Sequence, residues 1–153
     1  MKNRTAITVL MLVAPVAQAC GPRARSAEPE RSGAVTGPPV ATALEVNVGT
    51  AVDFSFHVTN HAARKLELLF LSGQTHDIVV VDSAGREVWR WSDGRMFTQS
   101  LQNRILESNA TLTWQATWRT ESGGLMPPGR YVAIASLLSE NKPLEQRVEF
   151  AVR

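Results

Sequence analysis

Strict alternation of apolar and polar residues constrains this chain more than any other feature of its sequence. In Val52–Asn60, VDFSFHVTN, every second residue up to Val58 is apolar, and Ala110–Trp118 repeats the pattern. A period of two places successive side chains on opposite faces of a β-strand, whereas a helix needs a period of about 3.6 residues. The alternation returns near the C-terminus in Val148–Val152, and no segment of useful length after Cys20 has the helical period.

Turn-forming residues separate these segments. Gly supplies positive φ, Pro fixes φ, and Asn, Asp and Ser also favour turns. The segments with such residues are Asn60–Arg64, Ser72–Gln74, Ser83–Gly85, Ser92–Gly94, Ser108–Asn109 and Pro127–Gly129. Two near-continuous apolar runs, Leu66–Leu71 and Ile78–Val81, predict central strands or strands covered by a neighbour. The sequence therefore predicts an all-β fold, an immunoglobulin-like antiparallel β-sandwich of about seven to eight strands.

Aromatic residues refine this prediction. Tyr131 follows the Pro-Pro-Gly turn and opens the predicted penultimate strand, as in a tyrosine corner, in which the hydroxyl bonds back to the preceding loop. Trp89 and Trp91 share one face of their segment. If that face points inward, both belong to the core, which a sandwich of this size favours. If it points outward, it forms an aromatic platform for sugar or protein binding.

Residues 1–19 have the composition of a secretory signal peptide. Lys2 and Arg4 precede an apolar stretch, Ala6–Ala17, that is too short to span a bilayer as a mature helix. The single cysteine, Cys20, directly follows Ala-Gln-Ala, where a lipoprotein signal peptidase would leave a lipid-bearing residue. We expect export and lipidation of Cys20, which would anchor the chain to the bacterial cell envelope. The alternative is an ordinary cleavage site and a periplasmic or secreted product.

The mature chain divides into a tether and one domain. Residues 20–43 are rich in Gly and Pro and contain little that could be buried, so we expect a disordered tether. Residues 44–153 are long enough to form one core without disulfides, and they contain no cysteine. Loss of Lys2 and Arg4 with the signal leaves 14 basic and 14 acidic residues. A nucleic-acid partner is therefore not expected, because that binding needs excess positive charge.

Catalytic and metal sites have little support in the sequence. Ser122 lies in a Glu-Ser-Gly-Gly motif, but no histidine and acid are spaced to activate it, so a loop tip is the favoured interpretation. His57 and His61 straddle a strand end without cysteine or carboxylate partners at metal spacing. His76 and Asp77 are expected to form a strand-end pair on the surface.

The stretch Ser72–Gln102 completes a specific pattern. With FSFHVTNHAARKLELLF before it and LMPPGRY after it, it resembles the BsuPI domain, the intracellular proteinase inhibitor family of bacilli, over about Val52 to Tyr131. The residues that carry the resemblance are Ser72-Gly73-Gln74, Asp77, Val80, Asp82, Trp89–Ser92 and Phe97-Thr98-Gln99. The resemblance implies an immunoglobulin-like domain without enzymatic activity or cofactor. It also implies inhibition of a subtilisin-like serine protease, which for an exported chain would have to be an exported protease.

An inhibitor of this kind needs an exposed segment whose side chain fills the specificity pocket of the protease. Subtilisin-like pockets accept large apolar residues, so the candidate contact residues are Met96, Phe97, Leu125 and Met126. For Phe97 the favoured alternative is a plug at one end of the sandwich. The other function that remains open is a cell-envelope interaction or structural module, with carbohydrate binding through Trp89 and Trp91 less favoured.

Overall fold

The structure is a computed structural model that describes residues 39–120 and 126–153. The predicted signal peptide, Cys20, the tether up to residue 38, Ser122 and Leu125 all lie outside these residues. Within the two described stretches the chain forms strands, and no helix is long or apolar enough to span a membrane.

Nine strands follow one another along the described chain. They are β1 (Val40–Val48), β2 (Val52–Asn60), β3 (Leu66–Phe70), β4 (His76–Asp82), β5 (Glu87–Arg90), β6 (Gln102–Leu106), β7 (Thr111–Trp118), β8 (Gly129–Leu137) and β9 (Leu144–Val152). The first strand begins at Val40, whereas the sequence predicted a tether up to residue 43. Val40 pairs with Asn60, so residues 40–43 belong to the β1–β2 ladder and not to the tether.

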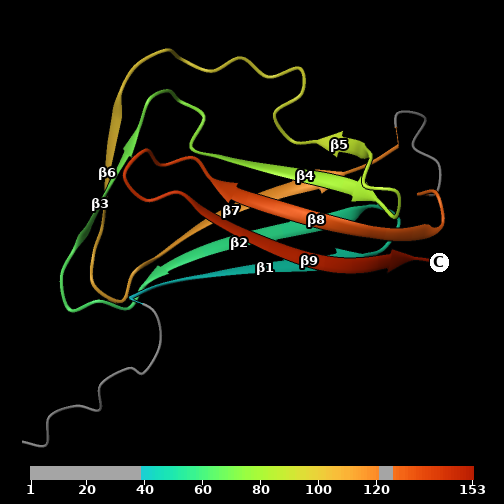
Figure 1. Cartoon of the computed structure of the whole chain (residues 1–153), viewed down its shortest axis with the longest axis horizontal. Coiled ribbons are helices and arrows are strands. Elements are labelled where there is room, and N and C mark those ends of the chain that lie inside the picture. Colours follow the sequence, from blue (N-terminus) through green and yellow to red (C-terminus); the bar gives the residue numbers. More distant parts are fainter. Residues whose placement is uncertain (1–38, 121–125) are drawn as a thin grey trace, which may run out of the picture. The chain divides into compact units, whose positions relative to one another are not determined.

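The strands form a sandwich, which confirms the predicted fold class (Figure 1). One layer has the order β1-β2-β7 and the other has the order β5-β4-β8-β9, and all their pairs are antiparallel. At one side the two layers are joined by Thr42, whose hydroxyl donates to Oε1 of Gln146 at 3.0 Å. The remaining strands, β3 and β6, pair only with each other as a two-stranded ribbon.

The core lies between the two layers and under the ribbon. The alternation predicted for β2 is confirmed, since Val52, Phe54, Phe56 and Val58 are all buried. The run Ile78–Val81 lies in β4, a central strand between β5 and β8, as expected. Leu66–Leu71, in contrast, is not part of a central strand: it lies in the ribbon, where one face is covered at Leu68 and Phe70 while Leu69 and Leu71 are exposed.

Two asparagines fasten the ribbon to the sandwich. Asn60 is fully buried at the end of β2, and its Nδ2 donates to the carbonyl oxygens of Arg64 and Leu106 at 2.8 and 3.0 Å. Asn141, in the loop between β8 and β9, lies along the free edge of β3. Its Oδ1 accepts from the Leu69 amide at 3.0 Å, and its Nδ2 donates to the Glu67 carbonyl at 2.8 Å. The Asn141 side chain thus makes the bonds that a neighbouring strand would make.

The aromatic predictions hold. The Tyr131 hydroxyl donates to the Pro127 carbonyl at 2.9 Å, which is the expected tyrosine corner. Trp89 and Trp91 are partly buried and pack against the core, and the Trp89 ring stacks 5.6 Å from that of Phe54. The outward platform for a sugar is therefore not formed.

Candidate functional site

The loop between β5 and β6, residues 91–101, carries the most exposed large apolar side chain of the described residues. Met96 is 99% exposed, and it lies near the middle of a long segment that forms neither helix nor strand. In Figure 1 this segment runs from the end of β5 back to the ribbon strand β6. A single exposed apolar side chain is common on a protein surface, so Met96 is a candidate contact residue only together with the structure of its neighbours.

The N-terminal side of the loop is fastened through Trp91. The Trp91 amide donates to the Ile78 carbonyl at 2.8 Å, which continues the pairing of β5 with β4. Arg95 folds back over Trp91: its Nε donates to the Trp91 carbonyl at 2.7 Å, and its guanidinium carbon lies 4.5 Å from the centre of the indole ring. A cation at this distance over an indole face is attracted to it. Arg95, the residue before Met96, is therefore held against the body of the domain.

The C-terminal side of the loop is fastened through Phe97 and Thr98. The Phe97 ring is half-buried and lies 5.7 Å from the ring of Trp91. The Thr98 carbonyl accepts from the Gly73 amide at 2.8 Å. This approach requires glycine, because a Cβ at position 73 would lie 2.6 Å from the Thr98 Oγ1. The residues on both sides of Met96 are thus anchored while Met96 itself points into solvent.

Asp77 supports the start of the loop from below. Its carboxylate is almost fully buried and accepts from the Ser92 hydroxyl at 2.9 Å and from the Ser92 amide at 3.2 Å. Nη1 of Arg90 completes the set at 2.7 Å from the carboxylate. Hydrogen bonds to Glu87 and to Asp77 raise the pKa of Arg90 above its ordinary value, so its guanidinium stays charged. A paired and fully bonded carboxylate of this kind fixes local geometry.

His76 lies beneath the same loop. It is only 5% exposed, and its ring centre lies 4.1 Å from that of Trp91 and 5.2 Å from that of Trp114. Nε2 has no hydrogen-bond partner among the described residues. Burial lowers the pKa of His76 from 6.5 to about 4, against the opposing effect of the neighbouring Asp77. The ring is therefore neutral at pH 7 and serves as a flat packing element.

The expectation of a surface pair at His76 and Asp77 is wrong. Both residues are buried, because the loop and Arg90 cover the start of β4. A signal for His76 was present in the sequence: it has the same parity in β4 as the buried Ile78 and Val80. Asp77 has the opposite parity, and only the later return of Ser92 over it explains its burial.

The four predicted contact residues have different positions. The Met96 side chain is exposed to solvent. Phe97 is half-buried against Trp91, in line with the alternative that it plugs one end of the sandwich. The Met126 side chain is 3% exposed and belongs to the core, and it lies just before the start of β8. The loop that carries Met96 packs near His76, which pairs with Leu137 at the other end of β8. Only Met96 and Phe97 are therefore brought together, and Leu125 lies outside the described residues.

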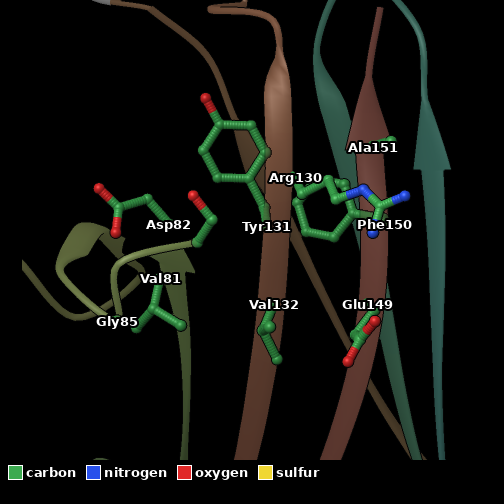
Figure 2. Close-up of a pocket in the computed structure, with 10 residues that line it drawn as sticks. Val81, Asp82, Gly85, Arg130, Tyr131, Val132, Glu149, Phe150 and Ala151 are labelled. Atoms are coloured by element: carbon green, nitrogen blue, oxygen red, sulfur yellow. The ribbon is translucent and has the colours of Figure 1, made fainter.

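A shallow concavity of about 660 Å³ lies elsewhere, on the outer face of the four-stranded sheet (Figure 2). Figure 2 shows Asp82, Tyr131 and Glu149, which come from β4, β8 and β9, around its wall. It contains none of the predicted contact residues. No group of three or more His, Cys, Asp or Glu side chains suited to a metal ion occurs in the part of the chain that the structure describes.

The fold and the loop together define a β-sandwich domain that presents an anchored, projecting segment. The model of the BsuPI family, described as intracellular proteinase inhibitor, matches residues 40–142. The chain belongs to this family, and the match begins at the first residue of β1. A comparison with curated protein sequences finds no significant match.

Several solved structures are similar over parts of their chains. The alkylpurine DNA glycosylase AlkC of Pseudomonas fluorescens, bound to DNA containing an abasic site analog, has 21% identity and a TM-score of 0.40, with 76% of this chain and 31% of that chain covered. The β-glucosidase EmGH1 of Erythrobacter marinus has 20% identity and a TM-score of 0.31 over 71% of this chain and 15% of that one. The β-glucosidase of Kluyveromyces marxianus has 14% identity and a TM-score of 0.38 over 74% and 14%. The chain thus spans about a third or less of these proteins.

Proposed function

We propose that this chain is a non-enzymatic inhibitor of a subtilisin-like serine protease and that Met96 is the side chain that enters the specificity pocket. The observation that carries the proposal is the combination of a fully exposed Met96 with anchored neighbours on both sides. Membership of the proteinase inhibitor family supports a protease as the partner.

Anchoring matters because binding costs entropy. A free loop loses conformational freedom when it enters a cleft, whereas a loop already fixed by its own contacts loses little. Here the Arg95 contact with Trp91 and the Gly73 bond to Thr98 fix the segment before any partner arrives. Met96 is unbranched and apolar, so it can fill an apolar pocket of imperfect shape.

The other candidates are less suited to this role. Met126 contributes to the core, and its removal from the core would cost about 2–5 kcal/mol if the cavity resembled that of other buried truncations. Phe97 supports Trp91 and therefore acts on the loop conformation instead of filling a pocket. Contact through Leu125 stays a prediction.

The location of the inhibitor is the second part of the proposal. We propose that residues 1–19 direct export and that Cys20 carries a lipid that holds the domain at the cell envelope. The charged start, the apolar stretch and the position of the only cysteine support this proposal. The target is then an exported protease.

Titration of the purified full chain against a subtilisin-like protease tests the inhibitory function. We expect inhibition of the hydrolysis of a small chromogenic peptide. Met96→Glu should raise the inhibition constant by about 100-fold or more, because a carboxylate would be buried without a partner in an apolar pocket. Val88→Glu is the matched control, since Val88 is also exposed but lies on β5.

Two results would contradict the proposal. If the wild-type chain at molar excess inhibits none of several subtilisin-like proteases, the proposed function is wrong. If wild type inhibits but Met96→Glu and Val88→Glu inhibit equally well, another segment enters the cleft.

A further inference from the structure

Four exposed large aliphatic side chains lie on the outward face of the β3–β6 ribbon or directly beside its end. In its register Leu69 lies opposite Asn103, Glu67 opposite Ile105 and Phe70 opposite Gln102. Residues two apart in a strand share a face, so Leu69 and Ile105 lie on the same outward face. Leu71 directly follows β3 and Leu101 directly precedes β6, so both lie at the end of this face. The exposed fractions are 36% at Leu69, 58% at Leu71, 70% at Leu101 and 51% at Ile105.

The opposite face of the ribbon is also apolar. Leu68, Phe70 and Leu106 are buried there and form part of the core. An antiparallel ribbon with one face on the core normally exposes polar residues on the other. Four exposed aliphatic side chains gathered at one place are therefore expected to be covered by a binding partner.

The ribbon leads directly into the loop that carries Met96. The Gly73 amide donates to the Thr98 carbonyl, so the two segments still lie side by side beyond Leu71 and Leu101. Leu101 follows Met96 by five positions, and a chain of that length spans at most about 18 Å. The apolar face and Met96 thus lie within the dimensions of one protein interface.

The area that a stable interface needs indicates which molecule covers this face. A protease–inhibitor interface buries about 800 Å² on each partner, and a projecting loop of a few residues supplies only part of that area. We propose that the protease held by Met96 also packs against the apolar face of the ribbon, with Leu71 and Leu101 at the centre of this second contact. This inference depends on the proposed inhibitory function and names a further part of the surface that performs it.

The ribbon is built to present such a surface. Asn60 bonds to the end of β6 and Asn141 bonds to β3, so both strands of the ribbon are fastened to the sandwich before binding. Glu67 and Asn103 on the same outward face provide polar groups beside the apolar residues. An apolar centre beside polar groups is the usual composition of a protein interface.

Inhibition constants of surface variants test this inference. The ribbon variant is the full chain with Leu71→Gln and Leu101→Gln, and the control carries Val48→Gln and Val88→Gln, which remove two exposed apolar side chains on β1 and β5. We expect the ribbon variant to raise the inhibition constant by about 10- to 100-fold and the control by less than about threefold. Circular dichroism and thermal melting check folding, and Ile105→Thr, which keeps a β-branched residue, replaces the double variant if it does not fold.

Each other outcome overturns the inference in a distinguishable way. Unchanged inhibition by the ribbon variant, together with loss of inhibition in Met96→Glu, overturns the second contact and leaves the inhibitory function intact. Failure of the wild-type chain to inhibit overturns both. If inhibition is unchanged but sedimentation shows a wild-type dimer that the ribbon variant does not form, a second copy of the chain covers the ribbon. If inhibition is unchanged but, among chains that also carry Cys20→Ala, only the one with the wild-type ribbon co-sediments with anionic lipid vesicles, the membrane surface covers it.

Discussion

His76 is a histidine that stays neutral at a pH at which an ordinary histidine is partly charged. It lies between Trp91 and Trp114, where it cannot be hydrated, and the positive charges of Arg95 and Arg104 also oppose its protonation. The nearby carboxylate of Asp77 favours protonation but does not compensate for burial. Protonating this buried ring costs free energy in the folded state, so protonation lowers the stability of the whole domain.

We predict that acid destabilises the domain through His76. Its pKa is lowered from 6.5 to about 4, so the unfolded chain binds the proton more readily than the folded chain. The contribution of neutral His76 to the free energy of unfolding is fully present above pH 6.5. It is lost as the pH falls toward 4, by roughly 3 kcal/mol in total. Urea unfolding at pH 7, 6, 5 and 4 measures the effect.

His76→Gln separates this effect from other titrations. The variant should be less stable at pH 7 but should lose most of the pH dependence between pH 6.5 and 4. His61→Asn, in the turn after β2, is the control and should keep the wild-type dependence. Asp82, whose pKa is lowered by the Arg86 amide, loses its own contribution only below pH 3.8. Equal slopes in wild type and His76→Gln would disprove the assignment to His76.

At the scale of elements, the contact between Gly73 and Thr98 joins the ribbon to the exposed loop. We predict that Gly73→Ala loosens the loop, because the added Cβ would lie 2.6 Å from the Thr98 Oγ1 and 3.2 Å from the Thr98 amide nitrogen. A clash of this kind costs about 1–3 kcal/mol. The inhibition constant should rise with a smaller loss of thermal stability, as measured by titration and melting of the same preparation.

Two further variants show whether the clash is the cause. Gly49→Ala is the control, since its Cβ would meet only the Ala51 carbonyl at 3.7 Å. Thr98→Ala removes the oxygen nearest to the new methyl group and should partly restore inhibition in the Gly73→Ala background. Gly73→Ala inhibiting as well as Gly49→Ala would mean that this contact does not hold the loop.

Alternation in the sequence predicted the strands that have one buried face, such as β2 and β7. It did not predict the ribbon, because a run such as Leu66–Leu71 has the same composition whether its second face meets the core or a partner. It did not reveal β6 either, since Gln102–Leu106 buries only Leu106 and lacks a period of two. The burial of Asp77 also depended on tertiary contacts that no local pattern encodes.

For the whole molecule, attachment to a membrane would decide which proteases the inhibitor can reach. We predict that the wild-type chain expressed in a bacterial host carries a lipid and fractionates with membranes, whereas Cys20→Ala is released in soluble form. The physical reason is that an acyl chain contributes about 0.8 kcal/mol for each buried methylene group. Mobility on gels and membrane fractionation measure the difference, and identical behaviour of the two chains would contradict lipidation. Both chains should inhibit equally in detergent, because residue 20 precedes the first strand.

No disulfide contributes to the stability of the sandwich, since residues 21–153 contain no cysteine. Its free energy of unfolding should therefore be independent of the thiol–disulfide balance of its surroundings. A cytoplasm rich in glutathione and an oxidising compartment outside it impose opposite demands on most small domains. A domain without cysteines meets both demands, so its core needs no change between the two kinds of compartment.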